Sequence, residues 1–158
     1  VAAAHLNKQL DLPRFDRAAD FLAENDIDLR AFVLLGAPYV PVEETVEWTV
    51  RTGEYAVERG ASVVSIIPVR GGNGELERLE ALGHFTPPSM RDVELALDEC
   101  TTYSTTVVTV DLWEIERIAS CESCKQQRIS RLGRMNLSGV VEAGVSCPDC
   151  RCAGGQGD

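Results

Sequence analysis

The sequence is poor in basic residues and has no long apolar run. Its 158 residues include 15 lysines and arginines against 25 aspartates and glutamates, which gives a formal net charge of −10. This balance argues against non-specific nucleic-acid binding by the chain as a whole, although it does not exclude a local basic patch. No apolar segment approaches the length of a membrane span and no signal peptide is visible, so we expect no membrane partner.

The cysteines are not spread along the chain as they are in a secreted protein held together by disulfides. The sequence has six, and five of them crowd together after position 120. Closely grouped thiols of this kind favour a reducing compartment, and we therefore expect a cytoplasmic protein.

The chain also lacks a start methionine, a leading strand and a recognisable catalytic set. It begins at Val1 within a predicted helix, so we expect it to be the back portion of a longer protein. The two histidines, His5 and His84, have no cysteine or serine placed as a catalytic partner, and no pair of carboxylates stands out. The sequence therefore assigns no catalytic residue.

The stretch from residue 29 to residue 74 predicts a strand, a helix and a second strand. Residues 31–35 are an unbroken apolar run, which is typical of a strand buried on both faces. Residues 61–67 form a second run, which a proline ends. Between the two runs, a helix is predicted from an apolar stripe that consists of Val42, Val46, Val50, Gly53 and Val57.

This order predicts a right-handed parallel crossover, because parallel strands need such a connection. The loops after the two strands, 36–41 and 68–74, would face a ligand, as they do in parallel α/β folds. A third strand is predicted at 105–110, and further helices at 1–10, 11 to about 25, 75–82, 89–100 and 125–137. The alternation predicts an α/β fold with a parallel sheet, and three strands amount to a partial (β/α) barrel at most.

Two cysteine pairs near the end of the chain form its strongest motif. Cys121-Glu-Ser-Cys124 and Cys147-Pro-Asp-Cys150 each place two residues between the thiols, a spacing that lets the backbone aim both sulfurs at one ion. The 22 intervening residues must fold back to bring the pairs together. Zinc is favoured over an iron–sulfur cluster, which thiolates also hold, and Cys152 is an alternative ligand to Cys150. The competing interpretation is a set of ordinary reduced thiols.

A basic island lies between the two cysteine pairs. It consists of Lys125, Arg128, Arg131 and Arg134, and no acidic residue occurs from 125 to 141. At a spacing of three residues these side chains share one broad helix face, which is a candidate for phosphate contacts of a nucleic acid. The alternative is a solvated helix face beside the metal site.

The order of these segments resembles the second half of a radical SAM domain. Leu6-Asn7-Lys8 and the helix at 15–19 are similar to the helix that follows the fourth barrel strand of that superfamily. Residues 32–36 resemble the fifth strand, which ends in a glycine near the adenosine, and residues 65–69 resemble the sixth, whose apolar residues back the adenine. The match covers residues 1 to about 112. It implies that S-adenosylmethionine contacts Leu35, Gly36, Ile67 and Pro68.

Within the superfamily, the closest resemblance is to the archaeosine-synthase radical SAM partner and its bacterial relatives. It rests on Ile67-Pro68-Val69-Arg70, Phe85-Thr86-Pro87-Pro88 and Met135-Asn136-Leu137. The resemblance implies radical modification of a tRNA base, with a [4Fe–4S] cluster and S-adenosylmethionine as cofactors. The CxxxCxxC loop that binds such a cluster is absent, since no cysteine precedes Cys100. We therefore expect a C-terminal portion that is inactive alone and that is completed by the missing N-terminal half of the barrel.

The predicted organisation has three parts. Residues 1–112 would be the back half of the partial barrel, 113–152 a helical cysteine-rich metal-binding segment, and 153–158 a disordered tail. The rival hypothesis is a non-enzymatic α/β binding module with a zinc knuckle. A CxxxCxxC motif encoded upstream in the same frame would separate the two.

Overall fold

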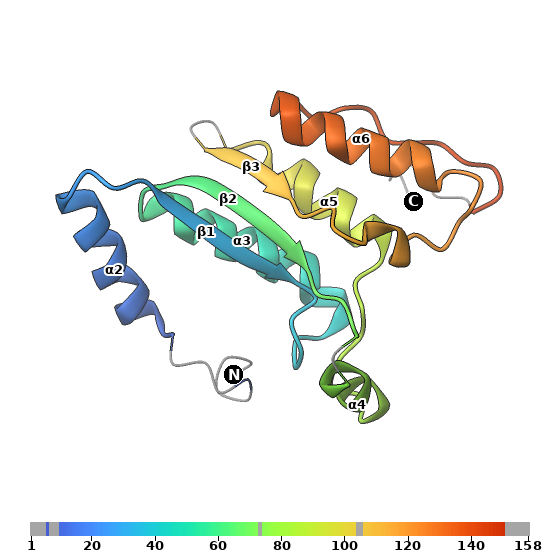
Figure 1. Cartoon of the computed structure of the whole chain (residues 1–158), viewed down its shortest axis with the longest axis horizontal. Helices are drawn as coiled ribbons and strands as arrows, with labels where there is room; N and C mark the ends of the chain where they lie inside the picture. Colours follow the sequence, from blue (N-terminus) through green and yellow to red (C-terminus); the bar gives the residue numbers. More distant parts are fainter. Residues whose placement is uncertain (1–5, 7–9, 73, 104–105, 151–158) are drawn as a thin grey trace.

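The computed structural model describes residues 6, 10–72, 74–103 and 106–150. The predicted helix at 1–10, most of the Leu6-Asn7-Lys8 motif, His5 and the tail at 153–158 therefore lie outside the described residues. Along the chain (Figure 1) the elements are α2 (Leu12–Glu24), β1 (Leu29–Leu35), the 3-10 turn η1 (Val42–Glu44), α3 (Thr45–Glu58), β2 (Ala61–Pro68), α4 (Glu75–Ala81), α5 (Met90–Cys100), β3 (Val107–Val110), the 3-10 turn η2 (Ile115–Arg117) and α6 (Lys125–Ser138).

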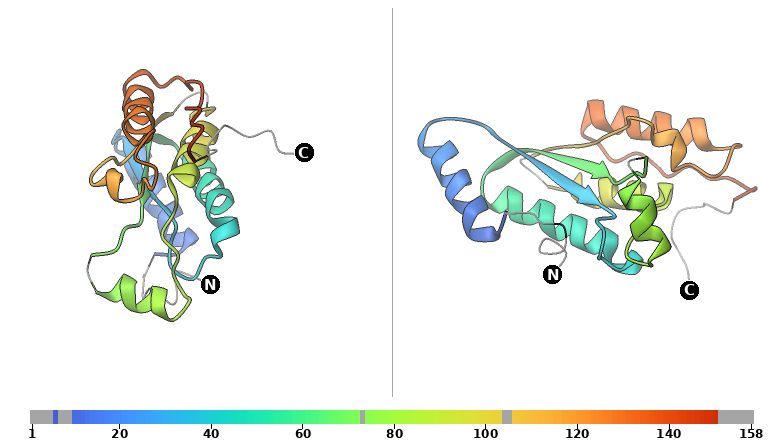
Figure 2. Two further views of the ribbon diagram at one scale, coloured as in Figure 1. Left: turned by 90° about the vertical axis from the view of Figure 1, so that its right-hand side faces the viewer. Right: turned by 60° about the horizontal axis from the view of Figure 1, so that its bottom comes forward.

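The sheet has three parallel strands in the order β1-β2-β3, which confirms the predicted α/β fold with a parallel sheet. The described residues do not form a closed barrel. Helices α3 and α5 connect successive strands and pack on the same side of the sheet (Figure 2). In the register of the sheet, Ile66 of β2 lies between Val33 of β1 and Val110 of β3.

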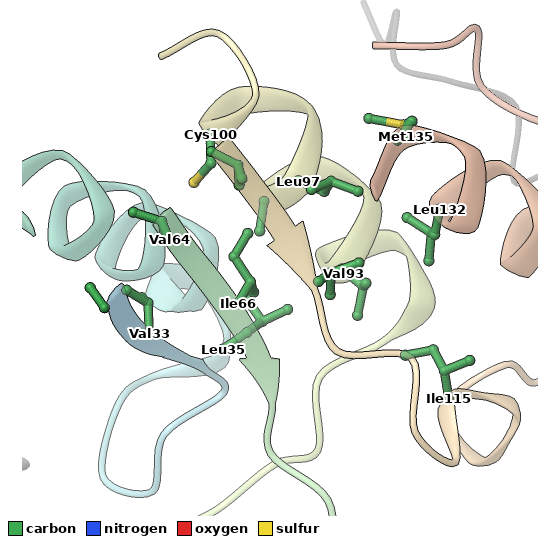
Figure 3. Close-up of a cluster of buried hydrophobic side chains, with 14 of the residues drawn as sticks. Val33, Leu35, Val64, Ile66, Val93, Leu97, Cys100, Ile115, Leu132 and Met135 are labelled. Atoms are coloured by element: carbon green, nitrogen blue, oxygen red, sulfur yellow. The ribbon is translucent and has the colours of Figure 1, made fainter. Parts of the chain in front are cut away.

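The core lies between the sheet and the helices (Figure 3). Burial of each of its large apolar side chains contributes about 1.5–3 kcal/mol. Cys100 lies on the buried face of α5 and is fully buried. The core brings together Val33, Leu35, Val64, Ile66, Val93, Leu97, Cys100, Ile115, Leu132 and Met135.

Two helices begin as the sequence predicts. Asp11 caps α2 by accepting a hydrogen bond from the backbone N–H of Arg14 at 2.9 Å. At the start of α5, Ser89 and Asp92 form a reciprocal capping box. Such caps satisfy backbone N–H groups that have no partner within the first turn of a helix.

The predicted stripe of α3 is confirmed in part: Gly53 is buried, and Val46, Val50 and Val57 pack half-buried against the core. Thr45 and Thr49 are buried, whereas Val42 precedes the helix and is 47% exposed, and Val50 lies at the flank. Thr49 can be buried because its hydroxyl lies 2.8 Å from the carbonyl oxygen of Thr45 and 3.1 Å from that of Leu34. The buried hydroxyl of Thr49 therefore has backbone hydrogen-bond acceptors and does not need water.

The prediction that the strand at 31–35 is buried on both faces is wrong. Its residues alternate, so that Val33 and Leu35 enter the core while Phe32 and Leu34 are 67% and 42% exposed. Helices α3 and α5 lie on the other side of the sheet, and no described element covers Phe32. We call this second side the open face; its residues are Arg30, Phe32, Leu34, Val63, Ser65, Ile67, Val107 and Thr109.

Helix α6 lies beside β3 and α5 (Figure 1). The amide group of Asn136 accepts a hydrogen bond from the backbone N–H of Val110 and donates one to its carbonyl oxygen, both at 2.8 Å. Leu132 and Met135 reach the common core, so the segment after residue 113 shares its packing with the α/β part. None of the helices in the described part of the chain is both long enough and apolar enough to cross a membrane.

Candidate metal centre

The four predicted cysteine ligands lie together in the structure. The Sγ atoms of Cys121 and Cys147 are 3.8 Å apart, and those of Cys124 and Cys150 are 3.6 Å apart. All four Sγ atoms lie within 4.8 Å of one another. Four thiolates at about 2.3 Å from a tetrahedral zinc ion would lie about 3.8 Å from each other. The cluster can therefore hold one metal ion, and the predicted fold-back of the intervening residues is confirmed.

The local backbone geometry directs the sulfurs of Cys121 and Cys124 toward the centre of the cluster. The carbonyl oxygens of Cys121 and Cys124 accept hydrogen bonds from the backbone N–H groups of Lys125 and Arg128, both at 3.0 Å. The Cys-Glu-Ser-Cys turn is thereby fixed to the first turn of α6. Cys147 and Cys150 lie on a second turn, and Cys124 and Cys147 are the buried members of the cluster.

The thiols of the first pair differ in their acidity. Burial raises the pKa of Cys124 to about 11. A hydrogen bond from the backbone of Cys124, together with smaller contributions from neighbouring thiols, lowers the pKa of Cys121. The thiolate is the form that binds a metal, so uptake of an ion has to displace the proton of Cys124.

Cys150 is disulfide-bonded in this structure. A disulfide sulfur is not a thiolate, and this bond must be reduced before Cys150 can serve as the fourth ligand. The alternative ligand named from the sequence, Cys152, lies outside the described residues. Metal loading of the centre therefore requires reducing conditions.

Each residue of the basic island pairs with a carboxylate. Arg128 donates to both carboxylate oxygens of Glu94 on α5, at 2.9 and 2.6 Å, and its side chain is 7% exposed. The hydrogen bonds to Glu94 raise the pKa of Arg128, and the nearby side chain of Cys124 adds to this effect. Lys125 pairs with Glu122 at 2.5 Å. The acids come from outside residues 125–141, which is why the sequence shows an unbroken island.

Arg131 is the most deeply buried charge of the island. Its side chain is 1% exposed and pairs with Asp98 of α5 at 2.7 Å. Burial raises the pKa of Asp98, an effect that Arg131 opposes. The same guanidinium donates to the carbonyl oxygens of Glu142 and Ala143, at 3.1 and 3.0 Å from Nε. Arg131 thus ties the segment after α6 to α5.

Arg134 has a different environment from Arg131, one turn away. It pairs with Glu142 at 2.7 Å, lowers the pKa of that carboxyl, and is 57% exposed. Phosphate binding by the four basic residues stays a prediction. Lys125 and Arg134 are the two that do not link α6 to α5 through an ion pair.

The residues that the resemblance places at S-adenosylmethionine lie at the carboxyl end of β1 and β2. Leu35 and Pro68 are buried, and Ile67 lies on the open face. Gly36 has a φ of +77°, and a β-carbon there would approach Cδ of Pro88 to 2.7 Å. The packing of the chain itself therefore requires this glycine. Contact with the cofactor stays a prediction for all four.

The loop after β2 is held by side chains of the chain itself. The carboxylate of Glu77 accepts hydrogen bonds from its own backbone N–H and from the backbone N–H of Gly72, and both lower its pKa, the first more strongly. Arg70 pairs with Asp111 after β3 at 2.8 Å, and its side chain is 8% exposed. This link was not predicted from the sequence, although Asp111 directly follows β3 and Arg70 lies two residues after the end of the neighbouring parallel strand β2.

No family model, curated protein or solved structure matches the chain. The function of the centre is therefore inferred from its own geometry, in which four cysteine sulfurs can bind one metal ion.

Proposed function

We propose that this chain is the C-terminal portion of a radical SAM enzyme that modifies a tRNA base. The observation that carries the proposal is the open face. Helices α3 and α5 pack on one side of the three parallel strands, and Phe32, Leu34 and Val107 are exposed on the other. In a (β/α) barrel this other side is the interior, which side chains from all strands fill. The missing N-terminal half of the barrel would cover it.

The loops after β1 and β2 support the same proposal. Parallel strands end at one edge of the sheet, and ligands of parallel α/β folds bind there. S-adenosylmethionine would lie against Ile67, while a CxxxCxxC loop in the missing half would hold the [4Fe–4S] cluster. When bound, these groups supply the radical that abstracts hydrogen from a substrate. Ile67 would contribute an apolar wall on the open face.

The cysteine cluster has a structural role in this proposal. Residues 139–150 contain no helix or strand, so the segment has few backbone hydrogen bonds of its own. A zinc ion on the four thiolates would fix its end to the start of α6. Lys125 and Arg134, the two residues of the basic island that do not pair with α5, form the basic surface in this proposal. The zinc ion would give this surface a defined place beside the barrel.

S-adenosylmethionine binding tests the radical SAM assignment. We expect weak or no binding to this chain alone, because it supplies only one wall of the site. The full-length enzyme, reconstituted with its cluster, should bind the cofactor and cleave it reductively. Calorimetry on both proteins is the measurement. Tight binding by this chain alone would contradict the proposal. A full-length protein that does not bind would favour the non-enzymatic α/β module with a zinc knuckle.

Binding of tRNA tests the basic surface separately. In the full-length enzyme, the double variant Lys125→Glu and Arg134→Glu should weaken tRNA binding and lower the slope of log K against log salt by about one to two. Arg128 and Arg131 are left intact because they hold α6 to α5.

The matched control changes the same charge elsewhere. Arg17 and Arg91 are exposed and belong to no ion pair in the described part of the chain. The double variant Arg17→Glu and Arg91→Glu should retain affinity close to that of the native enzyme. Equal affinity of the two double variants would remove Lys125 and Arg134 from the tRNA interface.

A further inference from the structure

A row of polar side chains crosses the open face from β1 to β3. Arg30 donates to Oγ of Ser65 from Nε at 3.0 Å and from Nη2 at 2.8 Å. Oγ of Ser65 lies 3.1 Å from Oγ1 of Thr109. These residues line a recess of about 460 Å³, which is completed by Phe32, Ile67, Val110, Asp111, Leu112 and Asn136.

The two donations from Arg30 favour one direction for the hydrogen bonds of this row. A serine hydroxyl has two lone pairs and one proton. Two N–H groups of Arg30 already donate to Oγ of Ser65, which favours donation of the Ser65 proton to Thr109 over the reverse direction. Thr109 then has its own proton left to donate, and the described residues provide no acceptor for it.

The recess also contains an unbalanced positive charge. Arg30 is always protonated, and it takes part in none of the ion pairs among the described residues. The one acid that lines the recess is Asp111. Its carboxylate is already engaged by Arg70 at 2.8 Å and by the backbone N–H of Trp113 at 3.0 Å. Donors and positive charge therefore exceed acceptors in the recess.

We propose that this recess binds an oxyanion, a carboxylate or phosphate group of a small molecule. The remaining N–H groups of Arg30 and the O–H of Thr109 would donate to its oxygens, and a guanidinium is well suited to both kinds of group. Ser65, which is 3% exposed, holds the guanidinium in place from beneath. The inference goes beyond the proposed function, because all the residues that line the recess belong to this chain; one of them, Ile67, also borders the proposed S-adenosylmethionine site.

Anion titration of the purified chain tests the inference. Inorganic phosphate and acetate are added in separate experiments at constant ionic strength, and the arginine Nε–H signals are followed by NMR. We expect a saturable shift of the Arg30 signal, identified by its loss in Arg30→Gln. A response to acetate alone would identify the ligand group as a carboxylate, and a response to phosphate alone as a phosphate. No saturable shift with either anion would overturn the inference.

Three variants locate the binding. Arg30→Gln should weaken binding of the responding anion roughly ten- to a hundredfold, since it removes a charged donor. Thr109→Val keeps the shape of the side chain and should weaken it roughly fivefold by loss of one donor. Arg91→Gln, on the exposed side of α5, should bind as the native chain does. Native affinity in Thr109→Val or in a folded Arg30→Gln would contradict the inference. Neither outcome bears on the radical SAM proposal, which S-adenosylmethionine binding tests.

Discussion

Replacing Arg131 by alanine is expected to lower the free energy of unfolding by about 3–5 kcal/mol. The substitution leaves the carboxylate of Asp98 and the carbonyl oxygens of Glu142 and Ala143 without their donor. Removal of one partner from a buried charged pair is costly because the other groups have already left water. Denaturation by urea, followed by circular dichroism at two protein concentrations, measures the change.

Arg134→Ala is the matched control, on the same helix one turn later. Its side chain is 57% exposed, so the loss of its ion pair with Glu142 should cost at most about 1 kcal/mol. If the two variants were equally stable, Arg131 would not link α6 and the following segment to α5. Replacing Arg131 and Asp98 together by methionine and leucine should recover part of the loss, because no unpaired charge is left.

The chain purified without oxygen and with a reductant should contain about one equivalent of zinc, and Cys124→Ser should contain less than about a tenth of an equivalent. The serine hydroxyl is a poor ligand for zinc, and Cys124 is the buried member of the first pair. Metal analysis of the two proteins measures the difference. Native protein that contains neither zinc nor iron after this purification would contradict a metal centre at these cysteines.

Cys100→Ser serves as the control because Cys100 is a cysteine of the core and not of the cluster. Its metal content should equal that of the native chain. Removal of the ion with a chelator should increase amide hydrogen exchange at 139–150, where the described backbone has no helix or strand. Exchange in β2 should change little, since its hydrogen bonds lie within the sheet.

Short-range patterns were sufficient to predict the parts of this molecule that depend on neighbouring residues. The start of the helix at 89–100 and the two cysteine turns each depend on residues within four positions of one another, and the parallel crossover follows from the order of two strands and one helix. In each case the physical cause is local: a free N–H at a helix start, or two sulfurs that a turn aims at one point.

Contacts that join distant segments could not be predicted in this way. The acid partners of Arg128 and Arg131 lie on α5, more than thirty residues earlier. The alternation of β1 was hidden because Phe32 and Leu34 are apolar although they are exposed. In α3 a threonine took a buried position that hydropathy assigns to valine, because the helix itself satisfies its hydroxyl.

The side chain of Asn136 blocks one edge of the sheet to the addition of a further strand. It occupies the N–H and the carbonyl oxygen of Val110, and these are groups that an incoming strand at that edge would need. Recruitment of a further strand is therefore directed to β1, at the opposite edge. Two copies of the chain cannot join through their β3 edges without displacing α6. The Asn136 amide, which joins α6 to β3, thus also protects the β3 edge of the sheet from self-association.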